Sequence, residues 1–109
     1  MGMISIAAFR PLAGKEEDLQ RVIDERLPLL RRLGLATERR EVRVRARSGV
    51  VVTISEWASQ EAIDRAHRTP EVLALWNRFW ACAEPVPLAV LEETAELFAT
   101  FEAIAGDGA

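Results

Sequence analysis

Few side chains of this sequence could carry acid–base chemistry near neutral pH. The chain has one histidine, His67, and no tyrosine. Imidazole is the ordinary side chain that titrates closest to neutral pH, so His67 is the first candidate for a general base. The simpler interpretation is that a lone histidine at the C-terminus of a helix caps that helix or contacts a second subunit.

Glu56 is the second catalytic candidate, because it lies near the end of a predicted strand. The expected register points its carboxylate toward the helix-covered face of the sheet. A carboxylate in that position would be partly desolvated, which raises its pKa and suits it to proton abstraction. The alternative, which we favour, is that Glu56 forms an ion pair with an arginine.

Large aromatic residues indicate where a ligand could bind. Trp76, Phe79 and Trp80 recur at helical spacing and could line a cavity between a helix and the sheet for a flat, hydrophobic ligand. Packing in the core is the simpler interpretation of all three, since large aromatics dominate small cores. Trp57 closes a predicted strand, and we expect it either at the mouth of the cavity or at a dimer interface.

The composition excludes several kinds of site. Cys82 is the only cysteine, so neither an intrachain disulfide nor a cluster of zinc-binding thiolates can form. Because histidine ligands are equally scarce, we expect no metal and no cofactor. Cys82 itself is interpreted as a small buried hydrophobic residue and not as a nucleophile.

Length and charge exclude further classes of partner. The 109 residues, 50% of them hydrophobic, suit one domain spanning residues 1–109. The 14 Lys and Arg against 17 Asp and Glu leave a formal net charge of -3, which argues against a nucleic-acid partner. No window approaches the roughly 20 apolar residues that span a bilayer, and no signal sequence is present, so we expect no membrane partner and a cytoplasmic location.

The first part of the chain predicts a strand followed by an amphipathic helix. Residues 3–9 are rich in apolar and β-branched residues and run up to Pro11, which cannot continue a sheet ladder. Apolar residues then recur at steps of three and four as far as a capping glycine, Gly34. Pro28 lies inside this helix, so we expect a kink or a restart near residues 24–28.

A hairpin is predicted next, and the length of its loop decides which residues share a face. The first strand alternates, with Val42 and Val44 on one face and a glutamate and arginines on the other. A two-residue loop would place Val50, Val52 and Ile54 of the next strand beside the arginines. A three-residue loop, with Gly49 left-handed as a bulge, places them beside the valines. We choose the three-residue loop because it gives one clean apolar face.

The second part predicts two helices and a last strand. Ser59 should cap a short helix, and Thr69-Pro70 should begin a longer one with strong helical periodicity. Two prolines end that helix, and residues 88–91 are predicted as the last strand of a four-stranded sheet. The tail from Glu92 has helical spacing, yet its aromatic content also suits a short added strand. Both alternatives remain open.

The order β-α-β-β-α-β predicts an α+β, ferredoxin-like sandwich with an antiparallel sheet. We expect the helices to cover one face of this sheet. The other face would be too apolar to stay in water, so we predict that a second subunit covers it in a homodimer. The residues assigned to that open face are Val51, Thr53, Trp57, Met3, Ala7 and Phe9.

Three segments resemble the dimeric α+β barrel superfamily, specifically the antibiotic biosynthesis monooxygenase-like domains. They are Glu56-Trp57-Ala58-Ser59-Gln60-Glu61-Ala62-Ile63, Ala66-His67 and Pro70-Glu71-Val72-Leu73-Ala74-Leu75-Trp76. In that family a strand ending in an aromatic leads through a Ser-capped turn to such helices, and the resemblance covers residues 3–104. It implies a dimeric barrel. Members include oxygenases of polyaromatic substrates, haem degraders and isomerases, so the resemblance specifies the fold better than the function.

The branches of this family can be compared residue by residue. The haem-degrading branch carries an asparagine, a tryptophan and a histidine ligand where this chain has Phe9, Ala66 and Trp76, so haem degradation is disfavoured. The quinone-forming oxygenases use asparagine, tryptophan and tyrosine around the substrate, and the only asparagine here is Asn77. The leading hypothesis is a cofactor-independent monooxygenase acting on a small hydrophobic or aromatic metabolite. The alternative is a non-catalytic homodimer that binds a ligand or another protein.

Charge is distributed unevenly along the chain. Five arginines lie between residues 39 and 47, whereas residues 84–109 contain acidic residues and no basic one. The C-terminal segment commonly reaches across the dimer in the family that the chain resembles. We therefore expect the acidic tail of one subunit near the arginine strand of the other, with anion binding by the arginines as the rival explanation.

Overall fold

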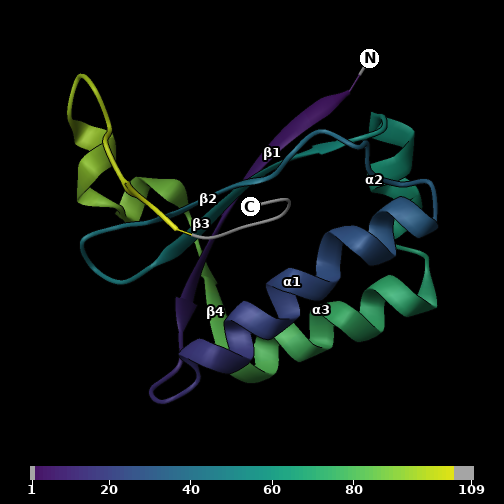
Figure 1. The fold of residues 1–109 in the computed structure, drawn as a ribbon, viewed down its shortest axis with the longest axis horizontal. Coiled ribbons are helices and arrows are strands. Elements are labelled where there is room, and N and C mark those ends of the chain that lie inside the picture. The colour runs from purple at the N-terminus through teal and green to yellow at the C-terminus, as the bar shows by residue number, and fades with distance from the viewer. Residues whose placement is uncertain (1, 105–109) are drawn as a thin grey trace.

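One five-stranded antiparallel sheet and three α-helices make up the computed structural model, which describes residues 2–104 (Figure 1). The spatial order of the strands is β4-β1-β3-β2-β5. This is the ferredoxin-like α+β arrangement that the sequence predicts, with one short strand added at the β2 edge. The elements are β1 (Met3–Pro11), α1 (Glu16–Arg32), β2 (Val42–Arg45), β3 (Val51–Trp57), α2 (Gln60–Ala66), α3 (Pro70–Cys82), β4 (Ala83–Val86), the 3-10 turns η1 (Leu88–Val90) and η2 (Glu92–Ala95), and β5 (Glu102–Ala103).

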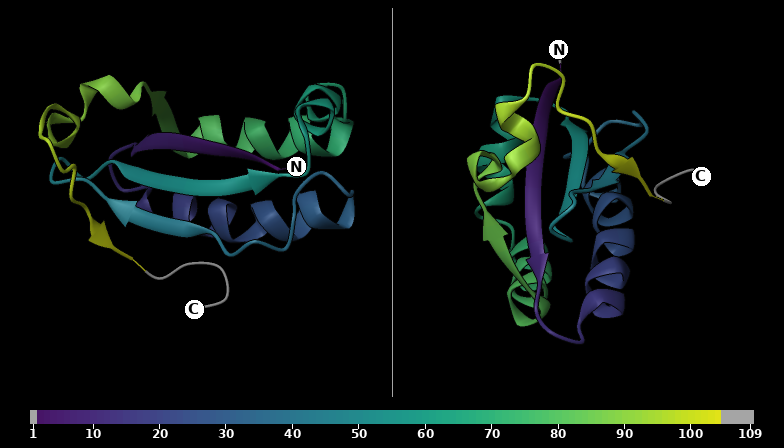
Figure 2. Two further views of the ribbon diagram at one scale, coloured as in Figure 1. Left: turned by 90° about the horizontal axis from the view of Figure 1, so that it is seen from above. Right: turned by 90° about the vertical axis from the view of Figure 1, so that its left-hand side faces the viewer.

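Helices α1 and α3 lie on the same face of the sheet, behind the strands in the left view of Figure 2. The core forms where apolar residues of both helices meet that face. Phe9 of β1 is buried there with Leu19 and Ile23 of α1 and with Leu75 and Phe79 of α3. A second buried cluster joins the C-terminal half of α1 to Trp57 and to α2.

The helices cover the face that we expected to be open. Phe9 pairs with Val51, and Ala7 pairs with Thr53, so these residues share one face, which is the helix-covered one. The open face instead carries Ile4, Ile6, Val42, Val44 and Ile54, in part covered by the tail. The assignment was wrong because both faces of β1 and β3 are apolar, so alternation alone could not select between them.

The hairpin between β2 and β3 has the three-residue loop that we predicted. The Ala46 N–H donates to the Val50 carbonyl at 2.9 Å, which leaves residues 47–49 as the loop. Gly49 has a φ of 94°, a conformation that few residues other than glycine adopt readily. As expected, Val44 pairs with Val52 on one face.

Most helix ends also follow the local signals. Gly34, with a φ of 72°, follows α1, and the Ser59 hydroxyl accepts the Ala62 N–H at 3.0 Å at the start of α2. Pro70 occupies the first turn of α3. Of the kink or restart expected at Pro28, the restart does not occur: α1 continues through this residue from Glu16 to Arg32.

The last strand lies earlier than predicted. β4 begins immediately after α3 and pairs with residues 8–11 of β1, whereas Leu88–Val90 forms a 3-10 turn. Pro85 is tolerated in β4 because β4 is an edge strand. The N–H that proline lacks is not needed there for a hydrogen bond to a second neighbouring strand. Of the two alternatives for the tail, the structure shows the strand, since β5 pairs with β2.

The acidic tail lies against the arginine strand, but it does so within one chain, whereas we expected the contact between two chains. Arg47 is within 4 Å of three tail carboxylates, those of Glu92, Glu93 and Glu96. Glu93 is buried and accepts the backbone N–H of Arg47 at 2.7 Å, a hydrogen bond that lowers the pKa of the Glu93 carboxyl. The tail is thus anchored to the β2–β3 loop by both charge and a buried hydrogen bond.

Candidate functional site

A large apolar cavity opens between β1, the α2–α3 region and the segment that follows β4. Its volume is about 630 Å³, within the range typical of small-ligand pockets. The walls combine aromatic and aliphatic side chains with three polar groups. The lining residues are Ser5, Ile6, Ala7, Ala8, Phe9, Arg26, Trp57, Ile63, His67, Trp76, Phe79, Trp80, Pro85, Val86, Pro87 and Leu88.

The cavity exists because β4 is short. β4 pairs with β1 only over residues 8–11, so residues 5–7 have no neighbouring strand on that side within residues 2–104. These residues line the cavity together with Pro85–Leu88, which belong to the end of β4 and the segment after it. An unpaired strand edge presents backbone N–H and C=O groups, which gives an otherwise apolar wall some capacity for hydrogen bonding.

The four aromatic candidates, Trp57, Trp76, Phe79 and Trp80, all line this cavity. Phe79 is buried and stacks on Phe9 with ring centroids 4.8 Å apart, so it belongs to both the core and the cavity wall. Trp80 also lines the cavity but remains 48% exposed. Trp57 is buried on the helix-covered face, where it forms part of the cavity wall. Aromatic walls of this kind favour a flat hydrophobic ligand.

His67 lies at the C-terminal end of α2 and lines the same cavity. Its Nδ1 is 2.8 Å from the carbonyl oxygen of Ile63, and its ring meets the ring of Trp76 edge-on with centroids 4.9 Å apart. A carbonyl can only accept, so Nδ1 carries the proton in this bond. In the neutral ring Nε2 then holds the free lone pair, which is the atom that a general base uses.

Glu56, the other catalytic candidate, does not reach the cavity. It pairs with Ile4 and points to the face opposite the helices, which corrects the expected orientation. The Thr37 hydroxyl donates to its carboxylate at 2.8 Å, and Arg39 forms an ion pair with it at 3.2 Å. The hydrogen bond from Thr37 is the main cause that lowers the pKa of Glu56, and the hydrogen bond and charge of Arg39 act in the same direction. Glu56 is therefore a weaker base than the partly desolvated carboxylate that we expected. The ion pair with an arginine, the alternative that we favoured, is present.

Arg26 is a polar cavity residue that the sequence analysis missed. It is buried in α1, its Nη1 donates to the Ser55 hydroxyl at 3.1 Å, and its guanidinium carbon lies 5.5 Å from the centre of the Trp57 ring. A signal for it exists in the sequence, because Arg26 follows Val22 and Ile23 by four and three residues. It therefore lies on the apolar stripe of the helix, where an arginine is unusual.

Behind Arg26 lies a buried cluster of charges. Arg43 donates through Nε to Glu41 and through Nη1 to Asp24, in both cases at 2.5 Å. The second Glu41 oxygen, Oε2, is 3.8 Å from Arg26 Nη1 and has no hydrogen-bond partner in the structure. Burial lowers the pKa of Arg26, although the negative charge of Glu41 raises it in part. Burial also acts to lower the pKa of Arg43, but the hydrogen bonds from Arg43 to Glu41 and Asp24 outweigh it and raise that pKa.

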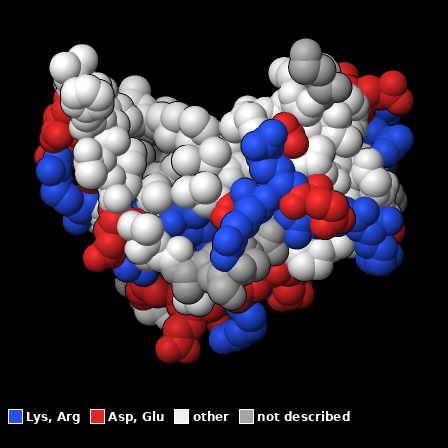
Figure 3. Space-filling view, turned by 45° about the horizontal axis from the view of Figure 1, so that its top comes forward, with Lys and Arg blue, Asp and Glu red and all other residues white. Residues whose placement is uncertain are grey.

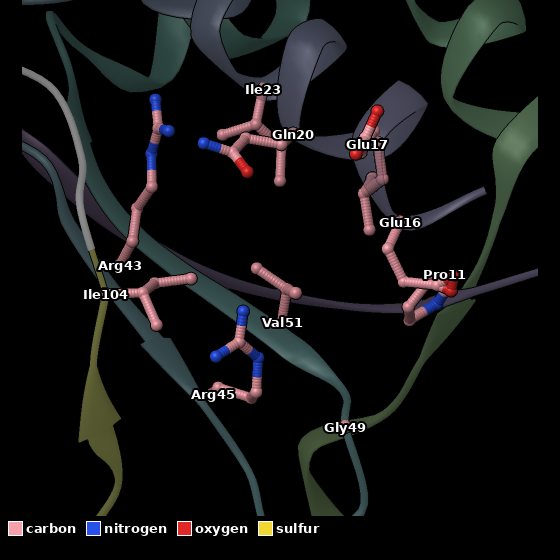
Figure 4. A pocket seen from close by; sticks show the side chains of 11 residues that line it. Pro11, Glu16, Glu17, Gln20, Ile23, Arg43, Arg45, Gly49, Val51 and Ile104 are labelled. Atoms are coloured by element: carbon pink, nitrogen blue, oxygen red, sulfur yellow. The ribbon is translucent and has the colours of Figure 1, made fainter. Parts of the chain in front are cut away.

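A second, smaller cavity of about 250 Å³ lies between α1 and the β2–β3 hairpin (Figure 4). Arg43 and Arg45 project from β2 into it, facing Gln20 and Ile23 of α1. Both arginines already have partners, since Arg45 donates to Glu102 of the tail at 3.1 Å. Two further carboxylates, from the start of α1, line the same space. Its charges are therefore largely balanced within the protein, and we do not take it as the functional site.

The remaining side chains offer no other reactive centre in residues 2–104. No group of three or more His, Cys, Asp or Glu residues in this range is placed to hold a metal ion. Cys82 is buried, and desolvation raises the pKa of its thiol, which agrees with its interpretation as a small buried residue. None of the described helices combines the length and hydrophobicity needed to cross a membrane.

The chain matches no protein-family model, no curated protein and no solved structure.

Proposed function

We propose that this chain is an antibiotic biosynthesis monooxygenase-like protein that binds a small hydrophobic or aromatic metabolite in the 630 Å³ cavity. The observation that carries the proposal is the cavity wall, where Trp57, Trp76, Phe79 and Trp80 line one open, mostly apolar space. Stacked or edge-on contacts with such side chains add to the hydrophobic contribution of a flat ring. The order of strands and helices is also that of the family that the sequence resembles.

Binding can be tested with purified protein and a panel of flat aromatic metabolites. Saturable quenching of tryptophan fluorescence by one class of compound is expected. The Trp80→Ala variant should weaken the binding of that class by about 2- to 10-fold, measured by calorimetry, because it removes one aromatic wall.

The matched control for Trp80 is Leu97→Ala. Leu97 is 92% exposed and does not line the cavity, so its truncation should leave affinity unchanged. Absence of saturable binding by every compound in the panel would overturn the proposal. Equal losses of affinity in the two variants would remove Trp80 from the binding site.

A second function, cofactor-independent oxygenation of the bound metabolite, is favoured by the tautomer of His67. With Nδ1–H donated to Ile63, Nε2 is the base that takes a proton from an acidic C–H of the substrate. The resulting carbanion reacts with O₂. One oxygen atom converts the CH₂ group to a carbonyl, and the other leaves as water together with the two hydrogens of that group.

Catalysis is separated from binding by the His67→Ala variant. If His67 is the base, oxygen uptake with a bound aromatic substrate should fall by about 100- to 10,000-fold, while affinity changes little. Saturable binding by the wild-type protein without any oxygen uptake would instead support the non-catalytic alternative, a homodimeric ligand-binding domain. An unchanged uptake rate in the variant would exclude His67 as the base.

We also propose that the protein is a homodimer formed through the open face of its sheet. Ile4, Ile6 and Val42 are at least half exposed on this face, and Val44 and Ile54 lie beside them. Figure 3 shows a hollow with few charged side chains between two raised ends of the molecule. A two-fold axis would bring the same apolar patch of two copies together, which is the usual way to cover such a face.

The dimer is tested by Val42→Glu, which introduces a charge at a position that is 50% exposed on the open face. We expect this variant to be monomeric in sedimentation experiments at concentrations where the wild type is dimeric, because a buried unpaired carboxylate is costly. Leu73→Glu is the control, since Leu73 is 40% exposed on α3, away from this face. A monomeric wild type would contradict the proposal, and so would a Val42→Glu dimer as stable as that of the control.

A further inference from the structure

Arg26 has hydrogen-bond donors that the protein does not use. A guanidinium group carries five N–H donors, and in Arg26 only Nη1 has an acceptor, the Ser55 hydroxyl. Nε and Nη2 have no acceptor within residues 2–104. Among the described residues, Glu41 Oε2 is the only side-chain nitrogen or oxygen that is both fully buried and without a partner. Nε and Nη2 of Arg26 lack a partner, so they are not fully buried and are open to the space beside them. The space that Arg26 lines is the cavity.

The charge around Arg26 is also incompletely balanced. Two buried arginines, Arg26 and Arg43, share one buried carboxylate, that of Glu41. Glu41 is hydrogen-bonded to Arg43 at 2.5 Å but lies 3.8 Å from Arg26, so it interacts more closely with Arg43. Asp24, the other partner of Arg43, is at the surface with 55% of its side chain exposed. One positive charge thus remains at the cavity wall, in a poorly solvated place where an anion would be attracted strongly.

Taking the proposed function as its basis, we propose that the ligand is an aromatic carboxylate whose carboxylate group binds the Nε–Nη2 edge of Arg26. The two N–H groups on this edge are parallel and match the two oxygens of a carboxylate. The position of the guanidinium is set by the hydrogen bond to Ser55 and by the ring of Trp57. The aromatic body of the ligand then lies against the aromatic side chains that line the same cavity.

The test compares two probes that differ in charge but hardly in shape, naphthoate and naphthamide, by calorimetry. Naphthoate should bind the wild-type protein about 10- to 100-fold more tightly, as expected for hydrogen bonds to a charged group. In Arg26→Lys, which keeps the charge but loses the two-pronged edge, most of this preference should disappear while naphthamide still binds. Arg78→Lys is the control, because Arg78 pairs with Glu25 outside the cavity, and it should keep the wild-type preference.

The outcomes separate this inference from the proposed function. Equal affinity of the wild-type protein for both probes would overturn the role of Arg26 and leave an aromatic-binding cavity intact. Failure of both probes to bind would count against the cavity itself and against this inference with it. The comparison of probes on the wild-type protein decides the question even if the Arg26→Lys variant does not fold, which circular dichroism would reveal.

Discussion

Replacing Glu41 by alanine should destabilise the protein by about 3–5 kcal/mol, one of the largest effects expected for a single substitution. The Glu41 side chain is fully buried and holds Arg43 at 2.5 Å while facing Arg26 at 3.8 Å. Its removal leaves two buried guanidinium groups without the carboxylate between them. The free energy of unfolding, measured by urea denaturation at neutral pH, gives the result directly.

Two further variants test the physical reason. Asp24→Ala removes the half-exposed partner of Arg43 and should cost only about 1 kcal/mol, because solvent screens this end of the cluster. The triple variant Arg26→Met/Glu41→Leu/Arg43→Met removes the whole buried triad and should recover much of the stability lost in Glu41→Ala, since apolar residues of similar size often replace buried ionic groups without loss. A Glu41→Ala protein as stable as wild type would show that the cluster is not a source of stability.

Phe79→Ala should also cost about 3–5 kcal/mol of unfolding free energy. The side chain is 1% exposed and stacks on Phe9 at the point where α1, α3 and β1 meet. Its removal leaves an empty space in this core, which also enlarges the ligand cavity. The expected loss of unfolding free energy has two parts: the apolar surface that is no longer buried and the cavity that the neighbouring side chains cannot fill.

The matched control for this prediction is Trp80→Ala on the next position of α3. Trp80 is larger than Phe79, but it is 48% exposed, so we expect a stability loss well below that of Phe79→Ala. Urea denaturation of the two variants under the same conditions makes the comparison. A larger loss for Trp80→Ala would contradict the assignment of Phe79 to the core and Trp80 to the rim of the cavity.

Features that depend on a few neighbouring residues could be predicted from the sequence. The Ser59 cap, the glycines at 34 and 49 and the start of α3 at Pro70 all follow from local conformational preferences. The position of β4 could not be predicted in the same way. Its strand is selected by pairing with β1, which lies more than 70 residues away in the chain, and no local pattern marks it.

The candidate site was predictable in its apolar part and not in its polar part. Trp76, Phe79 and Trp80 belong to one strongly periodic helix, so their common location follows from spacing. The orientation of Glu56 depended on which face of the sheet the helices cover, and that choice was wrong. Arg26 carried a signal, its place on an apolar stripe, but the groups around it come from β3 and from the residues before β2.

By itself, then, the sequence determined the α+β class, the order of the elements and the aromatic character of the cavity, because periodicity and turn residues act over short distances. Only the tertiary structure decided which sheet face is covered and which polar groups reach the cavity. The physical reason is that both faces of β1 and β3 are apolar, so the helices could have packed on either one. The helices cover the face on which Arg26, Glu41 and Arg43 form their buried charge cluster, and this choice places Arg26 and not Glu56 at the cavity wall.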